Sequence, residues 1–283
     1  MQVVETIPEV RAAVKAARAQ GKRVGFVPTM GYLHEGHLAL MRRARQDCDL
    51  VVVSIFVNPT QFGPNEDFDR YPRDLERDLA LCRTVPVDLV FHPEVAEVYP
   101  AFPPLTTVRV SALTDTLCGA SRPSHFEGVA TVVTKLFNIV RPDVAYFGQK
   151  DAQQVAVIRR MVADLNLDEI EIVPVPTVRE PDGLAMSSRN LYLSPAERQA
   201  ALVLFRSLQL AQDRVAAGQR EMRALVGEMR ALISAEPLAA VDYVEIVDYD
   251  TLQPIEHLKG RALAAVAVKF GKTRLIDNCV LEA

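Results

Sequence analysis

Two histidines lie three residues apart in the stretch PTMGYLHEGH, which spans Pro28 to His37. On the first turn of a helix this spacing places the imidazoles of His34 and His37 on one face, where both could donate hydrogen bonds to one phosphate. A helix N-terminus also favours phosphate, because its backbone N–H groups are unpaired and carry partial positive charge. Gly31 and Gly36 would let a nucleotide approach the backbone closely. The alternatives are two solvated surface histidines or part of a zinc site, although the spacing is not that of HExxH metalloproteases.

A second polar group follows the apolar run Leu50 to Val57. The carboxamides of Asn58 and Gln61 could orient a polar substrate without adding charge, at the end of a strand where open α/β sheets bind ligands. The simpler explanation of Asn58-Pro59 is a turn.

A third candidate, Tyr146 to Asp151, again combines a strand, a glycine and the start of a helix. Lys150 could meet a phosphate as a point charge, and Asp151 could cap the helix or accept a hydrogen bond from a ribose hydroxyl. The stretch lacks both the Walker A spacing and the glycine fingerprint of dinucleotide-binding folds. The sequence therefore supports neither a P-loop kinase nor a dehydrogenase.

The fourth candidate is Leu184 to Asn190, where two serines precede an arginine. Ser187, Ser188 and Arg189 could clasp a triphosphate from a loop that closes when substrate is present, or they could form an ordinary helix entry. Arg122-Pro123-Ser124-His125 similarly presents a cation and an imidazole just before a helix, with low specificity.

The elements that must position these residues alternate between strand and helix through residue 176, which predicts βαβ units and a parallel sheet. Short apolar runs predict the strands and amphipathic spacing predicts the helices between them. The predicted strands are Arg23–Val27, Leu50–Val57, Val87–Phe91, Asp143–Phe147, Glu169–Val175 and, more weakly, Thr107–Val110. The predicted helices are Gly36–Gln46, Asp67–Cys82, Phe126–Val140 and Ala152–Leu165.

The periodic pattern breaks between Val178 and Asn190, where turn residues take over. Ser194-Pro195-Ala196-Glu197 then has the form of a capping box and predicts a long helix to about Ala217, with a second helix near Arg220–Ala235. The runs Asp242–Val247, Leu263–Phe270 and Arg274–Val280 predict a small sheet with a hairpin at Gly271-Lys272. We therefore predict an α/β fold: a doubly wound parallel sheet (Rossmann-like) in residues 1–177, and a second, smaller α+β domain in residues 178–283.

The composition is that of an ordinary globular protein: of 283 residues, 49% are hydrophobic and 24% are charged. A formal net charge of -4 gives no bulk attraction to nucleic acid or to an anionic membrane, so any polyanion must be small and held locally. The four cysteines match neither a zinc spacing nor a compact disulfide framework, and we expect reduced thiols. No signal peptide, transit peptide or membrane span is evident, which leads us to expect a cytoplasmic location.

Taken in order, these motifs resemble those of the pantoate:beta-alanine ligase family. PTMGYLHEGH resembles the His-x-Gly-His signature of the nucleotidyltransferase superfamily, and AMSSRN resembles its second, Lys-Met-Ser-Lys-Ser-type signature. Four further stretches are similar to the ligase family in particular, namely FVNPTQF, SRPSHFEGVATVV, FGQKDAQQ and GLAMSSRNLYL. The resemblance covers nearly the whole chain.

The resemblance implies an ATP-dependent condensation of pantoate with beta-alanine that passes through pantoyl adenylate and releases AMP and pyrophosphate. It also implies Mg2+ with the ATP, and a homodimer. The ATP-binding residues it implies are Met30, Gly31, Tyr32, Leu33, His34, Glu35, Gly36, His37, Gly148, Gln149, Lys150, Asp151, Val178, Met186, Ser187, Ser188 and Arg189. The catalytic residues among them are His34, His37, Lys150, Ser187, Ser188 and Arg189, and the residues on the side of pantoate and beta-alanine are Gln61, Gln154, Asn58, Arg122 and His125.

The second signature departs from the superfamily pattern, because Ser188 stands where that pattern has its second Lys and Arg189 where it ends in Ser. The magnesium ligands are unknown from sequence; Asp74, Glu76 and Asp78 are candidates, although charges along a helix usually form its solvated face. Two other functions stay open. One is an adenylyl or cytidylyl transferase of the same superfamily, and the other is a nucleotide sensor without catalysis.

Overall fold

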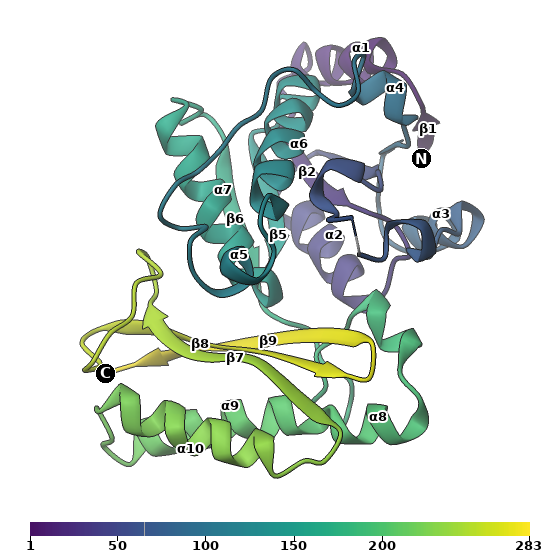
Figure 1. Cartoon of the computed structure of the whole chain (residues 1–283). Coiled ribbons are helices and arrows are strands. Elements are labelled where there is room, and N and C mark those ends of the chain that lie inside the picture. Colours follow the sequence, from purple (N-terminus) through teal and green to yellow (C-terminus); the bar gives the residue numbers. More distant parts are fainter. Residues whose placement is uncertain (65) are drawn as a thin grey trace. The chain divides into compact units, whose positions relative to one another are not determined.

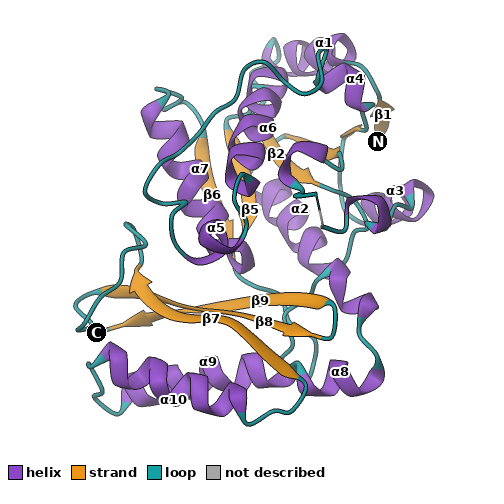
Figure 2. Ribbon diagram, viewed as in Figure 1, coloured by secondary structure: helices purple, strands orange, loops and turns teal. Residues whose placement is uncertain are grey.

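The computed structural model of the chain describes residues 1–64 and 66–283, which divide into two compact units (Figure 1). The first unit comprises residues 1–111, 122–149 and 154–176, and the second comprises residues 112–121, 150–153 and 177–283. Each unit is built around a sheet of its own (Figure 2). None of the described helices is long and apolar enough to cross a membrane.

The sheet of the first unit has the strand order β1-β4-β3-β2-β5-β6, and its neighbouring strands are all parallel. The chain passes from β2 through β3 to β4 on one side and then returns to pair β5 with β2, so the winding direction reverses between β2 and β5. This confirms the predicted doubly wound sheet. Its strands are β1 (Gln2–Val4), β2 (Val24–Thr29), β3 (Leu50–Ile55), β4 (Leu89–Phe91), β5 (Val144–Gly148) and β6 (Glu171–Val175).

Helices cover both faces of this sheet, which explains why its central strands are apolar throughout. In β2 the ring of Phe26 packs edge-on against Phe137, whereas the next residue, Val27, belongs to a buried cluster with Leu40 and Met41. The helices are α1 (Ile7–Arg18), α2 (Glu35–Asp47), α3 (Leu75–Thr84), α4 (Val95–Val98), α6 (His125–Val140) and α7 (Ala152–Asp164), the last beginning in residues of the second unit.

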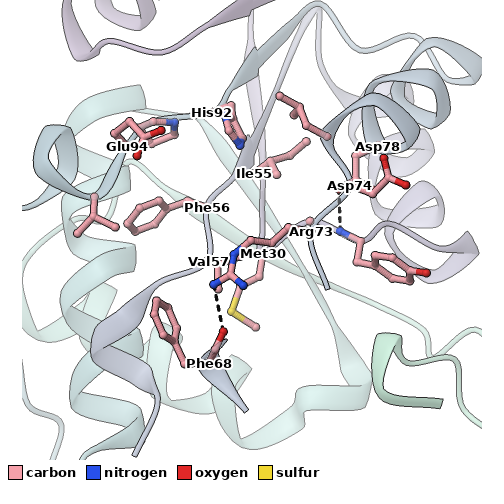
Figure 3. Close-up of a pocket in the computed structure, with 15 residues that line it drawn as sticks. Met30, Ile55, Phe56, Val57, Phe68, Arg73, Asp74, Asp78, His92 and Glu94 are labelled. Carbon is pink, nitrogen blue, oxygen red and sulfur yellow. Dashed lines mark hydrogen bonds between the residues drawn. The ribbon is translucent and has the colours of Figure 1, made fainter. Parts of the chain in front are cut away.

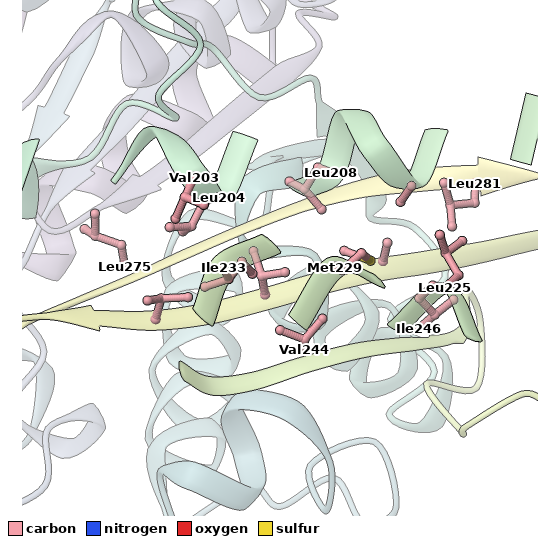
Figure 4. Packing of buried hydrophobic residues seen from close by; sticks show 14 of the residues in the cluster. Val203, Leu204, Leu208, Leu225, Met229, Ile233, Val244, Ile246, Leu275 and Leu281 are labelled. Atoms are coloured by element: carbon pink, nitrogen blue, oxygen red, sulfur yellow. The ribbon is translucent and has the colours of Figure 1, made fainter. Parts of the chain in front are cut away.

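The second unit has an antiparallel sheet of three strands, with α9 and α10 packed on one face. Leu204 and Leu208 of α9, with Leu225 and Met229 of α10, form its buried core against the strands (Figure 4). The strands are β7 (Ala239–Asp248), β8 (Arg261–Phe270) and β9 (Thr273–Glu282), and the helices are α5 (Leu117–Ser121), α8 (Pro195–Ala200), α9 (Leu202–Ala216) and α10 (Met222–Ser234). The predicted hairpin and the capping box of Ser194 with Glu197 are both confirmed.

Several elements differ from their predictions. Helix α3 begins at Leu75 rather than near Asp67, because Pro72 interrupts the chain and Asp74 then caps the helix by accepting the N–H of Arg77. The predicted long helix is divided at Ala201. Residues 107–110 form no strand; the N–H of Val108 instead donates to the side chain of Thr131.

Candidate active site

The loop between β2 and α2 turns sharply because two of its residues take left-handed backbone conformations. Gly31 has φ +78° and Tyr32 has φ 48°. A Cβ on Gly31 would lie 2.9 Å from Oδ2 of Asp78, so both the conformation and the space require glycine. The turn places the start of α2 at the carboxyl end of β2, beside the point where the sheet reverses direction.

Asp78 of α3 holds this turn in place. Its carboxylate is almost fully buried and accepts the backbone N–H groups of Tyr32 and Leu33, both at 2.7 Å. Burial raises the pKa of the Asp78 carboxyl, although the two N–H bonds act in the opposite direction. A guanidinium nitrogen of Arg77 lies 3.6 Å away. In the sequence Asp78 is only a magnesium candidate; its role in holding the turn could not be predicted there, because its two partners lie far away in the chain.

His34 and His37 lie side by side, as their spacing predicted, with ring centroids 4.1 Å apart. His34 is the N-cap of α2, and its Nδ1 accepts the N–H of Gly36 at 3.1 Å. Nδ1 of His37 in turn accepts the N–H of His34 at 3.2 Å. Because Nδ1 of each neutral ring is an acceptor, the ring proton lies on Nε2. The backbone of this turn therefore makes Nε2 the donor atom of both imidazoles.

Gln61 ends the short 3-10 turn Pro59–Gln61 and is held by Asn58. The Asn58 side chain is buried; it donates to Oε1 of Gln61 at 3.1 Å and to the carbonyl of Gly128 at 3.2 Å. Its oxygen accepts the hydroxyl of Tyr99 at 2.8 Å. Nε2 of Gln61 lies 3.0 Å from the sulfur of Met30, which brings the first two sequence motifs together. Asn58 thus orients Gln61 through contacts within the protein.

Arg122 and His125 hold the backbone of the same turn, together with Glu66. Arg122 donates to both carboxylate oxygens of Glu66 at 2.6 Å, and its third nitrogen lies 3.0 Å from Nε2 of His125. Nδ1 of His125 is 2.8 Å from the carbonyl oxygen of Gln61 and must donate to it, so this ring carries its proton on Nδ1. Although burial raises the pKa of Glu66, the bonds from Arg122 outweigh it and lower the pKa to about 2. Glu66 was missed by the sequence analysis.

A pocket of about 710 Å³, counting its open mouth, lies at the carboxyl ends of β2, β3 and β4 (Figure 3). Met30 and Phe56 line it, together with His92, Glu94 and Arg73, which the sequence analysis did not single out. The guanidinium of Arg73 binds the backbone of the protein: it donates to the carbonyl of Tyr71 at 2.9 Å and to that of Phe68 at 3.1 Å. The pocket therefore lies at the edge of the sheet where open α/β folds bind their ligands.

The Lys150 motif continues β5 into a 3-10 turn, Gln149–Asp151, and then into α7. Nζ of Lys150 lies 3.7 Å from the carboxylate of Asp151. Gln153 is buried and binds backbone, accepting the N–H of Cys118 at 2.9 Å and donating to the carbonyls of Leu113 and Thr116. Gln154, the partner of Gln61 in the predicted substrate set, is partly exposed in α7.

The Ser187–Arg189 motif follows a narrow hairpin. In this hairpin Arg179 and Ala185 form an antiparallel β-bridge, and the N–H of Met186 donates to the carbonyl of Val178 at 3.0 Å. Ser187 caps the 3-10 helix Ser188–Tyr192 by accepting the N–H of Arg189 at 3.3 Å. The predicted helix entry is therefore present, and it places Ser187, Ser188 and Arg189 on one tight turn.

A magnesium site made by the protein alone does not emerge from these residues. In residues 1–64 and 66–283, no group of three or more His, Cys, Asp and Glu side chains is arranged to hold a metal ion. Asp78 binds backbone N–H groups and Asp74 caps α3, so two of the three candidate carboxylates are already used.

Comparison with known proteins identifies the family to which the chain belongs. The family model described as pantoate-beta-alanine ligase matches residues 2–280. A pantothenate synthetase of Pelotomaculum thermopropionicum is 63% identical over 281 residues, 99% of each chain, and one of Heliobacterium modesticaldum is 61% identical over the full length of both.

The crystal structure of pantothenate synthetase from Thermus thermophilus has a TM-score of 0.93 at 50% identity and covers 99% of each chain. A pantoate-beta-alanine ligase from Francisella tularensis, described as complexed with beta-gamma ATP and beta-alanine, has a TM-score of 0.79 at 33% identity, covering 99% of this chain and 97% of its own. The chain therefore belongs to the pantoate-beta-alanine ligase family.

Proposed function

We propose a role for each candidate residue in the reaction of this family, which joins pantoate to beta-alanine by forming a C–N bond. ATP is the nucleotide substrate. In the first step a carboxylate oxygen of pantoate attacks the α-phosphorus of ATP, giving pantoyl adenylate and pyrophosphate. In the second step the amine of beta-alanine attacks the activated carbonyl, the amide forms, and AMP leaves. Neither step needs a covalent bond to the enzyme, so catalysis rests on positioning and on charge stabilisation.

The main observation that supports this proposal is the pair of imidazoles of His34 and His37. With Nδ1 of each ring accepting a backbone N–H, both rings offer Nε2–H to phosphate oxygens at the N-terminus of α2. Negative charge accumulates on the pyrophosphate as it leaves, and two fixed donors there favour its departure. We assign His37 as the hydrogen-bond donor to that leaving group: its Nε2–H stabilises the developing charge on the phosphate oxygens, and the ring keeps its proton.

The other predicted residues take complementary roles. Met30 to Gly36, Gly148, Gln149, Asp151, Val178 and Met186 contact the nucleotide, and Lys150, Ser187, Ser188 and Arg189 bind its phosphates. Gln61 and Gln154 hold pantoate, with Gln61 also near beta-alanine. Asn58, Arg122 and His125 act on this side by orienting Gln61, as their hydrogen bonds support.

We propose that residues 1–177 supply the ATP and pantoate sites and that residues 178–283 act as a lid carrying the Ser187 loop. Magnesium would enter with ATP and would neutralise charge on the triphosphate. The homodimer and the cytoplasmic location remain predictions.

The proposal is tested with purified protein, ATP, Mg2+ and pantoate. Pantoyl adenylate and pyrophosphate are expected first, and added beta-alanine should then yield pantothenate and AMP. Transfer of AMP to a phosphate acceptor, with pantoate inert, would instead identify an adenylyl transferase, which the match over residues 2–280 does not favour. Tight ATP binding without pantoate-dependent turnover would identify a sensor.

A further inference from the structure

Two adjacent polar residues of β9, Asp277 and Asn278, are buried in the second unit. Successive residues of a strand point to opposite faces of the sheet. Leu275, Cys279 and Leu281 pack in the cluster formed with α9 and α10, so Asp277 shares their face. Asn278 points to the other face. A strand whose neighbouring side chains are both polar and buried must satisfy each of them with specific partners.

Asp277 binds the base of the hairpin that leads to Ser187. Its two oxygens accept from the guanidinium of Arg179 at 2.6 and 3.0 Å, and only 2% of its side chain is exposed. The same guanidinium donates to the carbonyl of Gly183 at 3.0 Å and stacks on Phe205, 4.7 Å from the ring centroid. Arg179 is therefore fixed in one orientation, and the hairpin that carries it ends at Met186.

Asn278 binds the other proposed phosphate segment. Its side-chain N–H donates to the backbone carbonyl of Lys150 at 2.8 Å. This bond ties the 3-10 turn that presents the Lys150 ammonium to the middle of β9. Residues 150–153 belong to the second unit even though the chain on both sides of them belongs to the first.

We propose that Asp277 and Asn278 are positioning residues that hold the Lys150 turn and the Ser187–Arg189 turn in a fixed mutual register, so that both meet one triphosphate. Two adjacent residues on a hydrogen-bonded strand keep their separation constant, which makes β9 a rigid mount for the two cationic segments. This inference rests on the phosphate roles proposed above for Lys150 and Ser187–Arg189.

The first variant is Asn278→Leu, which keeps the approximate size of the side chain, removes its donor and adds no charge. Direct titration of MgATP into the full-length protein, without pantoate, should give an affinity about three- to tenfold weaker, the equivalent of one lost neutral hydrogen bond. The KM for pantoate should stay unchanged. Ser207→Ala is the matched control, because Ser207 is a buried polar residue of the same unit whose hydroxyl donates to the carbonyl of Leu204 within its own helix.

A double-mutant cycle separates positioning from general damage to the fold. If Asn278 acts through Lys150, Asn278→Leu should weaken ATP binding in the native background and have no further effect in a Lys150→Ala background. Arg179→Lys, which loses the two-pronged contact with Asp277, should behave in the same way toward Arg189→Ala. If either variant fails to fold, the other still carries the test.

Additive losses in both cycles, or unchanged ATP affinity in a folded Asn278→Leu protein, would overturn the inference. So would an equal rise in the KM for pantoate. The titration requires no turnover, so failure of the chain to make pantothenate would be a separate result that bears on the proposed function alone.

Discussion

At the scale of single residues, the backbone of the turn determines which ring nitrogen of His34 and His37 can donate a hydrogen bond. Each ring caps a backbone N–H with Nδ1, which fixes Nε2 as the donor. The three-residue spacing was visible in the sequence. The orientation of the rings was not, because it depends on which backbone N–H group each Nδ1 accepts in the folded turn.

Two substitutions at His34 separate capping from phosphate binding. Asn is among the best N-cap residues and its oxygen replaces the Nδ1 acceptor, so His34→Asn should keep the free energy of unfolding and yet lose about 100-fold in the rate of pantoyl adenylate formation, the typical effect of removing one transition-state donor. His34→Ala should lose the same rate and also about 0.5–2 kcal/mol of stability. Urea unfolding and single-turnover kinetics measure the two effects. Full activity in His34→Asn would remove the imidazole from the mechanism.

The Glu66–Arg122 pair predicts a pH dependence. Because the pKa of Glu66 falls from about 4.5 to about 2 in the folded protein, the pair stabilises the fold fully above pH 4.5 and loses its effect as the pH falls toward 2. The difference in melting temperature between the native protein and Glu66→Gln should therefore be constant from about pH 7 to about pH 5 and narrow below it. A difference that stays constant down to about pH 3 would contradict this assignment.

At the scale of elements, α3 supports the loop between β2 and α2, for which we propose ATP binding, through Asp78. Asp78→Asn replaces one acceptor oxygen with a donor facing a backbone N–H, so it should cost about 1–3 kcal/mol of stability and raise the KM for ATP. Glu76→Gln is the control, since Glu76 is exposed on the same helix. Equal effects of the two substitutions would assign the acidic residues of α3 a joint role, such as metal binding, in place of loop support.

The packing of α6 against the Gln61 turn depends on a glycine. A Cβ on Gly128 would lie 2.3 Å from the carbonyl oxygen of Thr60, so Gly128→Ala must push the turn away. We expect a loss of about 1–3 kcal/mol and a raised KM for pantoate. Gly227→Ala in α10 meets nothing within 4 Å and should instead gain about 0.5–1 kcal/mol. Thermal unfolding and steady-state kinetics compare the two; an unchanged KM in Gly128→Ala would mean that the turn does not place Gln61.

The elements differ in how far sequence could predict them. Strands β2, β3 and β5 are recognisable because burial on both faces makes them continuous apolar runs. Strand β1 has only three residues and offers no such run. Helix α1 was missed although Thr6 and Glu9 form a capping box and Pro8 lies in its first turn, signals that were present in the sequence.

The same limit applies to the candidate site. Motifs that are local, such as the histidine pair and the Ser187 turn, can be found from spacing. Supporting contacts such as Asp78 with Leu33 or Glu66 with Arg122 join residues 45 and 56 positions apart. Nothing in the spacing of such residues indicates that they meet, so only the fold reveals them.

At the scale of the whole molecule, a net charge of -4 coexists with a site for a highly charged nucleotide. The net charge does not exclude such a site, because the proposed phosphate ligands lie in a few short segments. They are the N–H groups of one helix N-terminus, two imidazoles, two serine hydroxyls, one lysine and one arginine. The four cysteines are free thiols, so neither unit depends on a disulfide. Each unit instead has its own apolar core.

The central claim is that the carboxylate of pantoate attacks the α-phosphorus of ATP. Pantoate labelled with 18O in its carboxylate, turned over with ATP, Mg2+ and beta-alanine, tests this directly by mass spectrometry of the nucleotide product. Attack at the α-phosphorus predicts AMP that carries one 18O atom from each labelled pantoate consumed. Formation of pantothenate with unlabelled AMP would contradict the pantoyl adenylate and the roles assigned to His34 and His37.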